Sequence, residues 1–193
     1  MMNTAQKVYT MLGNESLWGV AARCHGLLTE ADIAYCICGG VAVCLHGYQR
    51  NTTDLDLIIR SDDSESVQRV LTNAGFAWDS EKAEFRTKDG IAIPFLIAGQ
   101  KAGKGTEVSV SEPVGDPNVE QIEGLCVVRL SRLIEMKIAC GMSNLRRTHK
   151  DFADVVELIA IRHLDRSFAR HLHKSLRPTF RELVRNASAL DDE

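Results

Sequence analysis

Two aspartates, Asp54 and Asp56, stand two residues apart in the run D-L-D-L-I-I at 54–59. Successive side chains of a strand point to opposite faces, so both carboxylates are predicted to project from one face of an extended segment over 54–60. Mg²⁺ is often held by one or two carboxylates together with substrate phosphates and water. The pair is therefore a candidate catalytic site that binds Mg²⁺ or Mn²⁺. The alternative is two unrelated acids at a solvated strand end.

Residues just upstream add groups that suit a phosphate. Gly39 and Gly40 follow an apolar run and precede a short helical pattern, and two glycines at such a place let the backbone approach a bulky anion. Arg50 and Thr52 supply a guanidinium and a hydroxyl beside the aspartates. Two alternatives stay open: the glycines form only a tight turn, and Arg50 only neutralises the carboxylates.

The periodicity of apolar residues predicts the elements that carry these groups. Alternation of strands and helices early and helices late predicts an α/β (α+β) fold, with a small mixed sheet flanked by helices and a C-terminal helical bundle. The predicted division is 1–124 for the α/β core with its N-terminal helices and 125–193 for a helical region packed on it. Strands are expected at 33–38, 54–60, 76–78, 84–87, 91–98 and 126–128, a loop at 99–118, and helices within 4–34, 168–189 and at 41–46, 64–73, 131–142 and 148–163.

Net charge, apolar runs and cysteine spacing disfavour several classes of protein. The 193 residues carry a net charge of −3, which disfavours a protein that mainly binds the nucleic-acid backbone. A basic stretch near the C-terminus leaves a nucleic-acid-binding regulator as an alternative to a solvated helix face. No apolar run approaches a membrane span, no secretory signal is visible, and the six cysteines lack the spacing of a metal site. A cytoplasmic location is expected.

The run Gly39-Gly40 to Arg50-x-Thr52-x-Asp54-x-Asp56 resembles the signature of the DNA polymerase β-like nucleotidyltransferase superfamily. Two further stretches, 45–47 and the helical pattern over 133–154, are similar to its AbiEii-type branch, which includes toxin-like proteins of toxin–antitoxin systems. The resemblance covers roughly 33–158.

The resemblance implies transfer of a nucleotidyl group from an NTP to an acceptor, which is RNA, a protein or a small molecule. It implies that Asp54 and Asp56 bind the metal and that the NTP is held by residues of the first motif and of the later helices. It also implies a cognate protein partner if the protein is toxin-like. The residues implied to bind the NTP are Gly39, Gly40, Arg50, Thr52, Lys137 and Asp151, with Asp154 as a further orienting acid; Lys137, Asp151 and Asp154 are alternatively ordinary surface ion pairs.

One position departs from the superfamily pattern. Its third carboxylate is expected in the strand at 91–98, where this chain has Pro94. Proline has no oxygen to bind a metal or accept a proton. Either another acid such as Glu84 or Asp89 replaces it, or the chain is a catalytically impaired NTP- or partner-binding protein of the same fold. His46 is expected to pack at a helix end, with contact to a phosphate or the acceptor as the alternative.

Overall fold

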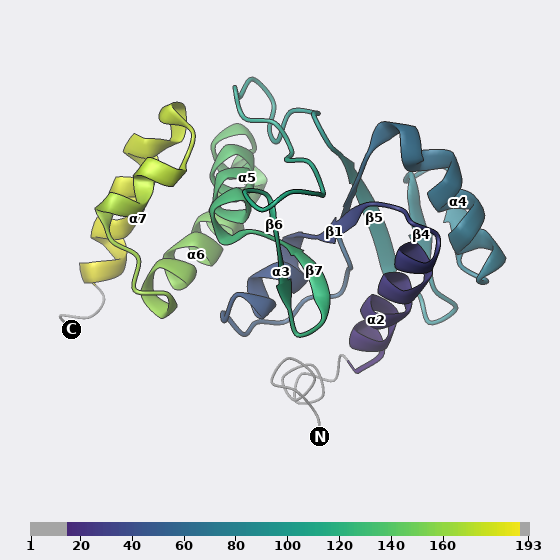
Figure 1. The fold of residues 1–193 in the computed structure, drawn as a ribbon. Helices are drawn as coiled ribbons and strands as arrows, with labels where there is room; N and C mark the ends of the chain where they lie inside the picture. Colours follow the sequence, from purple (N-terminus) through teal and green to yellow (C-terminus); the bar gives the residue numbers. More distant parts are fainter. Residues whose placement is uncertain (1–14, 190–193) are drawn as a thin grey trace.

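A computed structural model describes residues 15–189, which fold around a seven-stranded mixed sheet (Figure 1). Its strands are β1 (Tyr35–Ile37), β2 (Leu57–Ile59), β3 (Ala77–Asp79), β4 (Glu84–Arg86), β5 (Ala92–Ile97), β6 (Val119–Ile122) and β7 (Leu125–Val128). Their order is β3-β4-β5-β2-β1-β7-β6. β1 is antiparallel to β2 and parallel to β7, while β2 is parallel to β5. The candidate aspartates therefore lead into a central strand.

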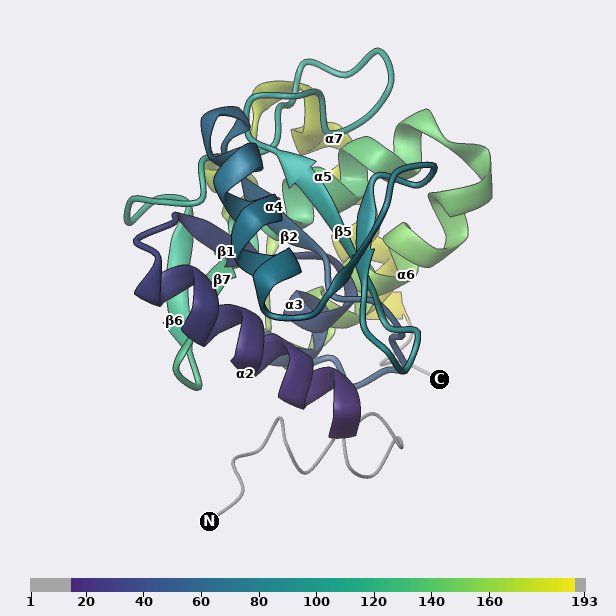
Figure 2. The ribbon, with the colours of Figure 1, turned by 90° about the vertical axis from the view of Figure 1, so that its right-hand side faces the viewer.

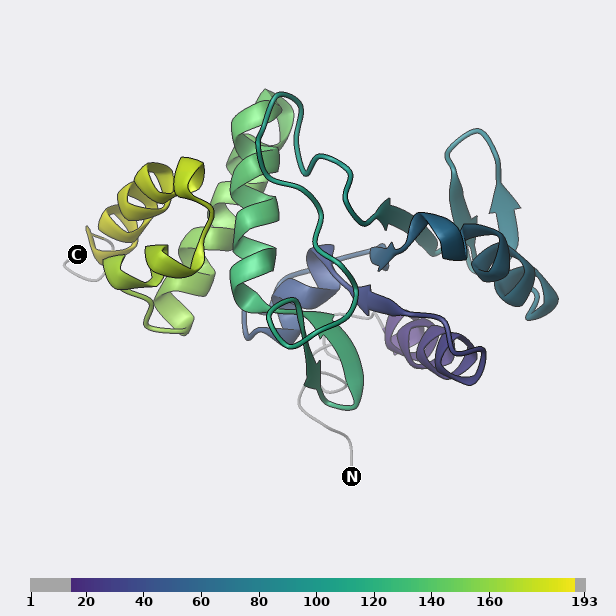
Figure 3. The ribbon, with the colours of Figure 1, turned by 45° about the horizontal axis from the view of Figure 1, so that its top comes forward.

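The helices form two layers, one on each side of the sheet (Figures 2 and 3). α2 (Glu15–Glu30) and α4 (Ser64–Asn73) lie together on one side. α5 (Leu130–Ser143), α6 (Leu145–Ile161) and α7 (Arg177–Ala189) form the other layer, and the short α3 (Gly39–Leu45) contacts α5. Short 3-10 helices are η1 (Ser61–Asp63), η2 (Arg166–His171) and η3 (Lys174–Leu176). Within residues 15–189, every helix is too short or too polar to cross a membrane.

The mixed α/β architecture with a helical C-terminal part confirms the predicted fold class. α4 spans the predicted 64–73, and β5 continues through Pro94 within the strand predicted at 91–98. β6 was not predicted, because its residues are only partly buried at the sheet edge and show weak alternation. Part of the helix expected within 4–34 lies outside the described residues. The division between 124 and 125 stays a prediction.

Two apolar cores meet at α5. One core joins the sheet to α2, α3 and α4 and includes Leu133 and Met136 of α5. The other joins α5 to α6 and α7 and includes Ile134 and Ile138 of α5. Because α5 is packed on both sides, even Lys137 on this helix is buried. The fold thus encloses a charged side chain next to the sheet.

Candidate active site

Asp54 and Asp56 lie in the extended segment just before β2. Asp54 forms a parallel bridge with Ala92, and the same register continues along β2 and β5, so that Asp56 lies opposite Pro94. Leu55 between them is fully buried, whereas both aspartates are partly exposed. The two carboxylates therefore lie on the face opposite to the one that packs into the core, as the alternation predicts.

The Gly39-Gly40 turn lies directly against these aspartates. Gly39 has φ +61°, and a Cβ there would lie 1.8 Å from Oδ2 of Asp56. The Gly40 N–H donates a hydrogen bond to the Asp56 carboxylate, and a Cβ on Gly40 would lie 2.2 Å from Oγ1 of Thr52. Thr52 in turn donates to Oδ1 of Asp54 at 3.2 Å. Both positions need glycine because the turn and the aspartate segment approach so closely.

The surroundings of Asp56 compensate its negative charge only in part. Burial raises its pKa to about 6, and the nearby Asp54 carboxylate adds to this; Lys137, Arg147 and the Gly40 N–H only partly offset the rise. Within the described residues, no cationic nitrogen lies within 4.0 Å of either aspartate. A bound cation would favour the ionised form of two neighbouring carboxylates that lack an ion pair.

A second pair of aspartates, on α6, is fully neutralised. Lys137 Nζ lies 3.1 Å from Oδ1 of Asp151 and 2.6 Å from Oδ2 of Asp154. Arg50 donates to both carboxylate oxygens of Asp154, at 2.6 and 2.9 Å, and Arg147 Nε lies 3.1 Å from Oδ2 of Asp151. We call these five residues the ion network. Burial alone would raise the pKa of Asp151, but Lys137 and Arg147 outweigh it and hold that pKa below its ordinary value.

The ion network corrects two sequence-based alternatives. Arg50 pairs with Asp154 and makes no ion pair with Asp54 or Asp56, so it does not neutralise that pair. Lys137, Asp151 and Asp154 are buried, so they are not ordinary surface charges. Whether any of them binds an NTP stays a prediction.

A cavity of about 210 Å³ separates Asp56 from the ion network. Its polar wall is formed by Asp56, Lys137, Arg147 and Asp151, together with the Gly39 backbone. Its apolar wall comes from β5, α5 and the loop after β5, namely Leu96, Ala102, Leu133, Met136 and Cys140, with Cys38 beside Gly39. The fold thus brings four of the predicted site residues, Asp56, Gly39, Lys137 and Asp151, to one cavity. Asp54, Gly40, Thr52 and Arg50 adjoin it through the contacts described above.

Arg147 is a cavity residue that the sequence analysis did not select. Its side chain is 53% exposed while it pairs with Asp151, so part of its guanidinium remains open to a ligand. The sequence signal was the spacing of four residues to Asp151, which puts both on one face of a helix. That spacing also fits an ordinary surface pair, and only the cavity distinguishes the two.

His46 and the cysteines take structural positions. His46 is 1% exposed, its Nε2 lies 2.8 Å from the Val128 carbonyl oxygen, and burial lowers its pKa. It packs at the end of α3, as expected. All six cysteines are free thiols, and burial raises the pKa of Cys38 beside the cavity, which keeps that thiol protonated. A protonated thiol is a poor metal ligand.

The donor set at the aspartates suits a hard divalent cation. Among residues 15–189, no three His, Cys, Asp or Glu side chains gather closely enough to hold a metal by themselves. Two carboxylates are sufficient for Mg²⁺ when phosphates and water complete the shell. Asp54 and Asp56, which make no ion pair with the described residues and lie in a segment closely packed by glycines, therefore fit such an ion together with a polyphosphate.

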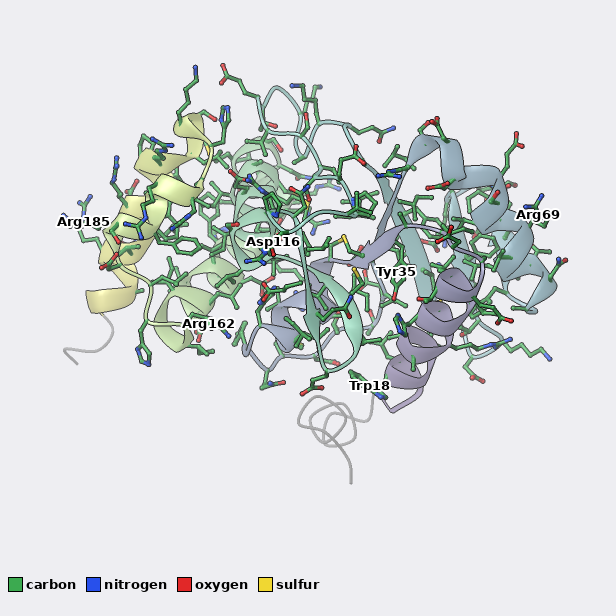
Figure 4. The ribbon with its side chains drawn as sticks, in the orientation of Figure 1. Trp18, Tyr35, Arg69, Asp116, Arg162 and Arg185 are labelled. Carbon is green, nitrogen blue, oxygen red and sulfur yellow. The ribbon has the colours of Figure 1, made fainter. Side chains whose placement is uncertain are left out.

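The basic residues near the C-terminus lie away from this cavity. Figure 4 places Arg162 at the end of α6 and Arg185 on the outer side of α7, both remote from the sheet. None of the basic residues of 162–187 lines the cavity described above. These side chains form an exposed surface of the outer helices, and the nucleic-acid alternative stays untested.

Comparisons with known proteins agree with this geometry. Residues 22–143 match the family model of aminoglycoside-2''-adenylyltransferase, a match that includes Asp54, Asp56 and Lys137. The chain matches no curated protein sequence. The nucleotidyltransferase superfamily predicted from the sequence is supported, whereas the AbiEii-type branch is not confirmed.

Solved structures of similar fold include three nucleotidyltransferase-type proteins. An antigenic nucleotidyltransferase-like protein of Paracoccidioides brasiliensis is 18% identical, covers 90% of this chain and 89% of its own, and has a TM-score of 0.55. ANT(2'')-Ia in complex with adenylyl-2''-tobramycin is 12% identical over 86% of this chain and 98% of its own, with a TM-score of 0.55. A Thermotoga maritima protein assigned as a nucleotidyltransferase is 15% identical over 72% and 93%, with a TM-score of 0.54. At these identities the likeness establishes the fold.

Proposed function

Because the chain belongs to the aminoglycoside-2''-adenylyltransferase family, we propose that it transfers a nucleotidyl group from an NTP to an acceptor, with Mg²⁺ or Mn²⁺ held by Asp54 and Asp56. One observation carries the proposal. The Asp56 carboxylate, which has a raised pKa and forms no ion pair with the described residues, faces a cavity whose other wall carries Lys137 and Arg147. A metal-bound triphosphate supplies positive charge to the aspartates and negative charge to the two cations.

Each residue then has a distinct task. A bound divalent cation polarises the phosphate oxygens and stabilises charge that develops during transfer. Asp54 and Asp56 hold that ion, and the Thr52 hydroxyl fixes Asp54 while the Gly40 N–H fixes Asp56. Arg147 offers guanidinium donors to phosphate oxygens. Arg50, Asp154 and Asp151 fix the position of Lys137 through the ion network.

For the acceptor we propose a hydroxyl of a small polyhydroxylated molecule. ANT(2'')-Ia binds such a molecule in its adenylylated form, adenylyl-2''-tobramycin. RNA and protein side chains are the competing acceptors, and a toxin-like role with a cognate partner belongs to those alternatives. A catalytically impaired NTP-binding protein is the competing function, motivated by Pro94 next to Asp56.

The test uses NTPs labelled at the α-phosphate, Mg²⁺, and separate acceptor pools of aminoglycosides, RNA and protein. We expect label transfer to the small-molecule pool, and a loss of at least about 100-fold in Asp54→Asn and Asp56→Asn. Asp62→Asn is the matched control, because Asp62 is exposed in η1 and does not line the cavity. Equal transfer by all four proteins would exclude the aspartate site. Stabilisation by NTP without transfer to any pool would support the impaired protein instead.

A further inference from the structure

A carboxylate lies two strands away from Asp56 on the same face of the sheet. Asp56 lies opposite Pro94 of β5, and Pro94 pairs with Glu84 of β4. Directly paired residues of neighbouring strands project to the same face. Asp56, Pro94 and Glu84 therefore form one row across three strands, and strand spacing puts the outer two backbones about 10 Å apart.

The burial of the neighbouring residues confirms which face this is. Phe85, beside Glu84 on β4, is 0% exposed and pairs with Ile93 of β5, which is also 0% exposed. Leu55 of the aspartate segment is buried on that same face. Glu84 thus projects away from the core, on the same face as Asp54 and Asp56.

Arg86 fixes the Glu84 side chain in place. The Arg86 guanidinium contacts Oε1 of Glu84, donates to the Gly90 carbonyl oxygen at 3.2 Å and lies 3.7 Å from Asp79 of β3. Glu84 is only 13% exposed. Its second oxygen, Oε2, accepts no hydrogen bond from the described residues. One oxygen is therefore held by a cation while the other remains free to accept a proton.

The strand between Glu84 and the two aspartates carries no titrating side chain on this face, where its residues are Ala92, Pro94 and Leu96, the last of which also lines the cavity. Ala92 and Pro94 are the β5 residues in the rows of Asp54 and Asp56. Neither can accept a proton, and neither reaches far above the sheet. An acceptor hydroxyl above β5 would lie between Glu84 and a metal-bound nucleotide. In the proposed function Asp54 and Asp56 would hold the cation, which leaves Glu84 as the remaining carboxylate of these rows.

We propose that Glu84 is the general base of the transfer reaction, an inference that rests on the proposed function. The Glu84 carboxylate takes the proton of the acceptor hydroxyl while the hydroxyl oxygen forms a bond to the α-phosphorus of the NTP. The bond from the α-phosphorus to the oxygen that bridges to the β-phosphate breaks, and that oxygen leaves with the electron pair as part of pyrophosphate. Glu84 thereby supplies from β4 what Pro94 cannot supply from β5.

The experiment compares Glu84→Gln with Glu81→Gln, an exposed glutamate in the same hairpin. For Glu84→Gln we expect kcat to fall about 100-fold or more, an unchanged KM for the NTP, and loss of the acid limb of the pH profile of kcat. Glu84→Asp should keep that acid limb at reduced kcat. The charged groups that face Glu84 are Arg86 on its own strand, Asp79 on β3 and Asp56 across β5, so Asp79→Asn is measured as well and should leave the limb in place.

Folding is checked by the melting temperature and by stabilisation with Mg²⁺ and NTP, both of which Glu84→Gln should retain. If Glu84→Gln matches Glu81→Gln while Asp54→Asn is inactive, the proposed function stands and the role of Glu84 is wrong. If kcat falls but the acid limb persists in Glu84→Gln, Glu84 is a structural residue and the proposal is equally wrong. If the wild-type protein transfers label to no acceptor, the proposed function fails and the inference fails with it.

Discussion

The molecule holds two pairs of aspartates with the same chemistry and opposite surroundings. Asp151 and Asp154 are each 1% exposed, and three cations of the ion network contact them. Asp54 and Asp56 are less buried, yet no cation of the described chain touches them. The pKa of Asp151 is held below its ordinary value, whereas that of Asp56 rises to about 6.

This difference separates a structural use of carboxylates from a ligand-binding one. Taking a charge out of water is costly unless a partner is supplied. For the α6 pair the protein supplies its own partners from α5, from α6 and from the segment before β2. For the pair before β2 the described residues supply N–H and hydroxyl donors but no ion pair, which is why we propose that a bound cation provides the compensating charge.

The largest change in stability is expected at Asp154, whose cationic partners belong to the protein itself. Asp154→Asn leaves Arg50 facing a neutral amide and Lys137 paired with Asp151 alone, and we expect the free energy of unfolding to drop by about 3–5 kcal/mol. Urea unfolding measures this drop. Asp116→Asn is the control, because Asp116 is 92% exposed and its pair with Arg129 should contribute only about 0–1 kcal/mol. Equal losses in the two variants would show that the ion network does not stabilise the fold.

At Asp56 we expect the opposite effect, namely that removing the carboxylate raises the free energy of unfolding when no metal is bound. Folding raises the pKa of Asp56, so the folded protein binds this proton more tightly than the unfolded chain does. The resulting stabilisation is complete below the ordinary value of 3.8 and is lost as pH rises through about 6. Without metal at neutral pH, Asp56→Asn should therefore be more stable than wild type, by up to about 3 kcal/mol.

The measurement is urea unfolding in EDTA at several pH values from about 4 to 8. The difference between wild type and Asp56→Asn should grow with pH. Asp151 gives the internal comparison: its lowered pKa stabilises the fold above its unfolded-state pKa, and this contribution is lost as pH falls. A wild-type advantage over Asp56→Asn that persists across this range would contradict the uncompensated charge at Asp56.

A bound cation should offset the loss of stability that the ionised Asp56 carboxylate causes. Mg²⁺ with a non-hydrolysable NTP at 100 times its Kd should stabilise the wild-type protein by about 2.7 kcal/mol. Thermal unfolding with and without the ligands measures this, and Asp54→Asn and Asp56→Asn should lose the effect. Asp62→Asn should keep it, and stabilisation that survives in both site variants would place the ligand elsewhere.

The sequence was sufficient to predict the parts of the site that are local in the chain. Alternation around Leu55 predicted that Asp54 and Asp56 lie on one face, and the structure places them so. The two glycines were assigned to the same site as the aspartates, and the structure places the Gly39-Gly40 turn directly against them. Strong periodicity also located α4. These predictions depend on the spacing of neighbouring residues, which the backbone geometry translates directly into side-chain direction.

The parts that depend on distant pairing were not predictable. Arg50 and Asp154 are 104 residues apart, and nothing in either segment specifies this contact. The burial of Lys137 could not be predicted from its own helix, because it arises only when α6 packs on α5. The row that joins Glu84 to Asp56 requires the register of three neighbouring segments of the sheet, which the spacing of residues within each segment does not specify.

Arg147 belongs to both regions, and it offers the finest test of the distinction between them. It pairs with Asp151, yet Lys137 still satisfies that carboxylate when Arg147 is removed. Since Arg147 is half-exposed, Arg147→Met should cost no more than about 1 kcal/mol of stability. The loss of a phosphate contact should raise the KM for the NTP about 10-fold. The control is Arg146→Met, an exposed neighbour outside the cavity. An unchanged KM with a large loss of stability would assign Arg147 to the structural network alone, because a residue that only neutralises Asp151 has no means of sensing the nucleotide.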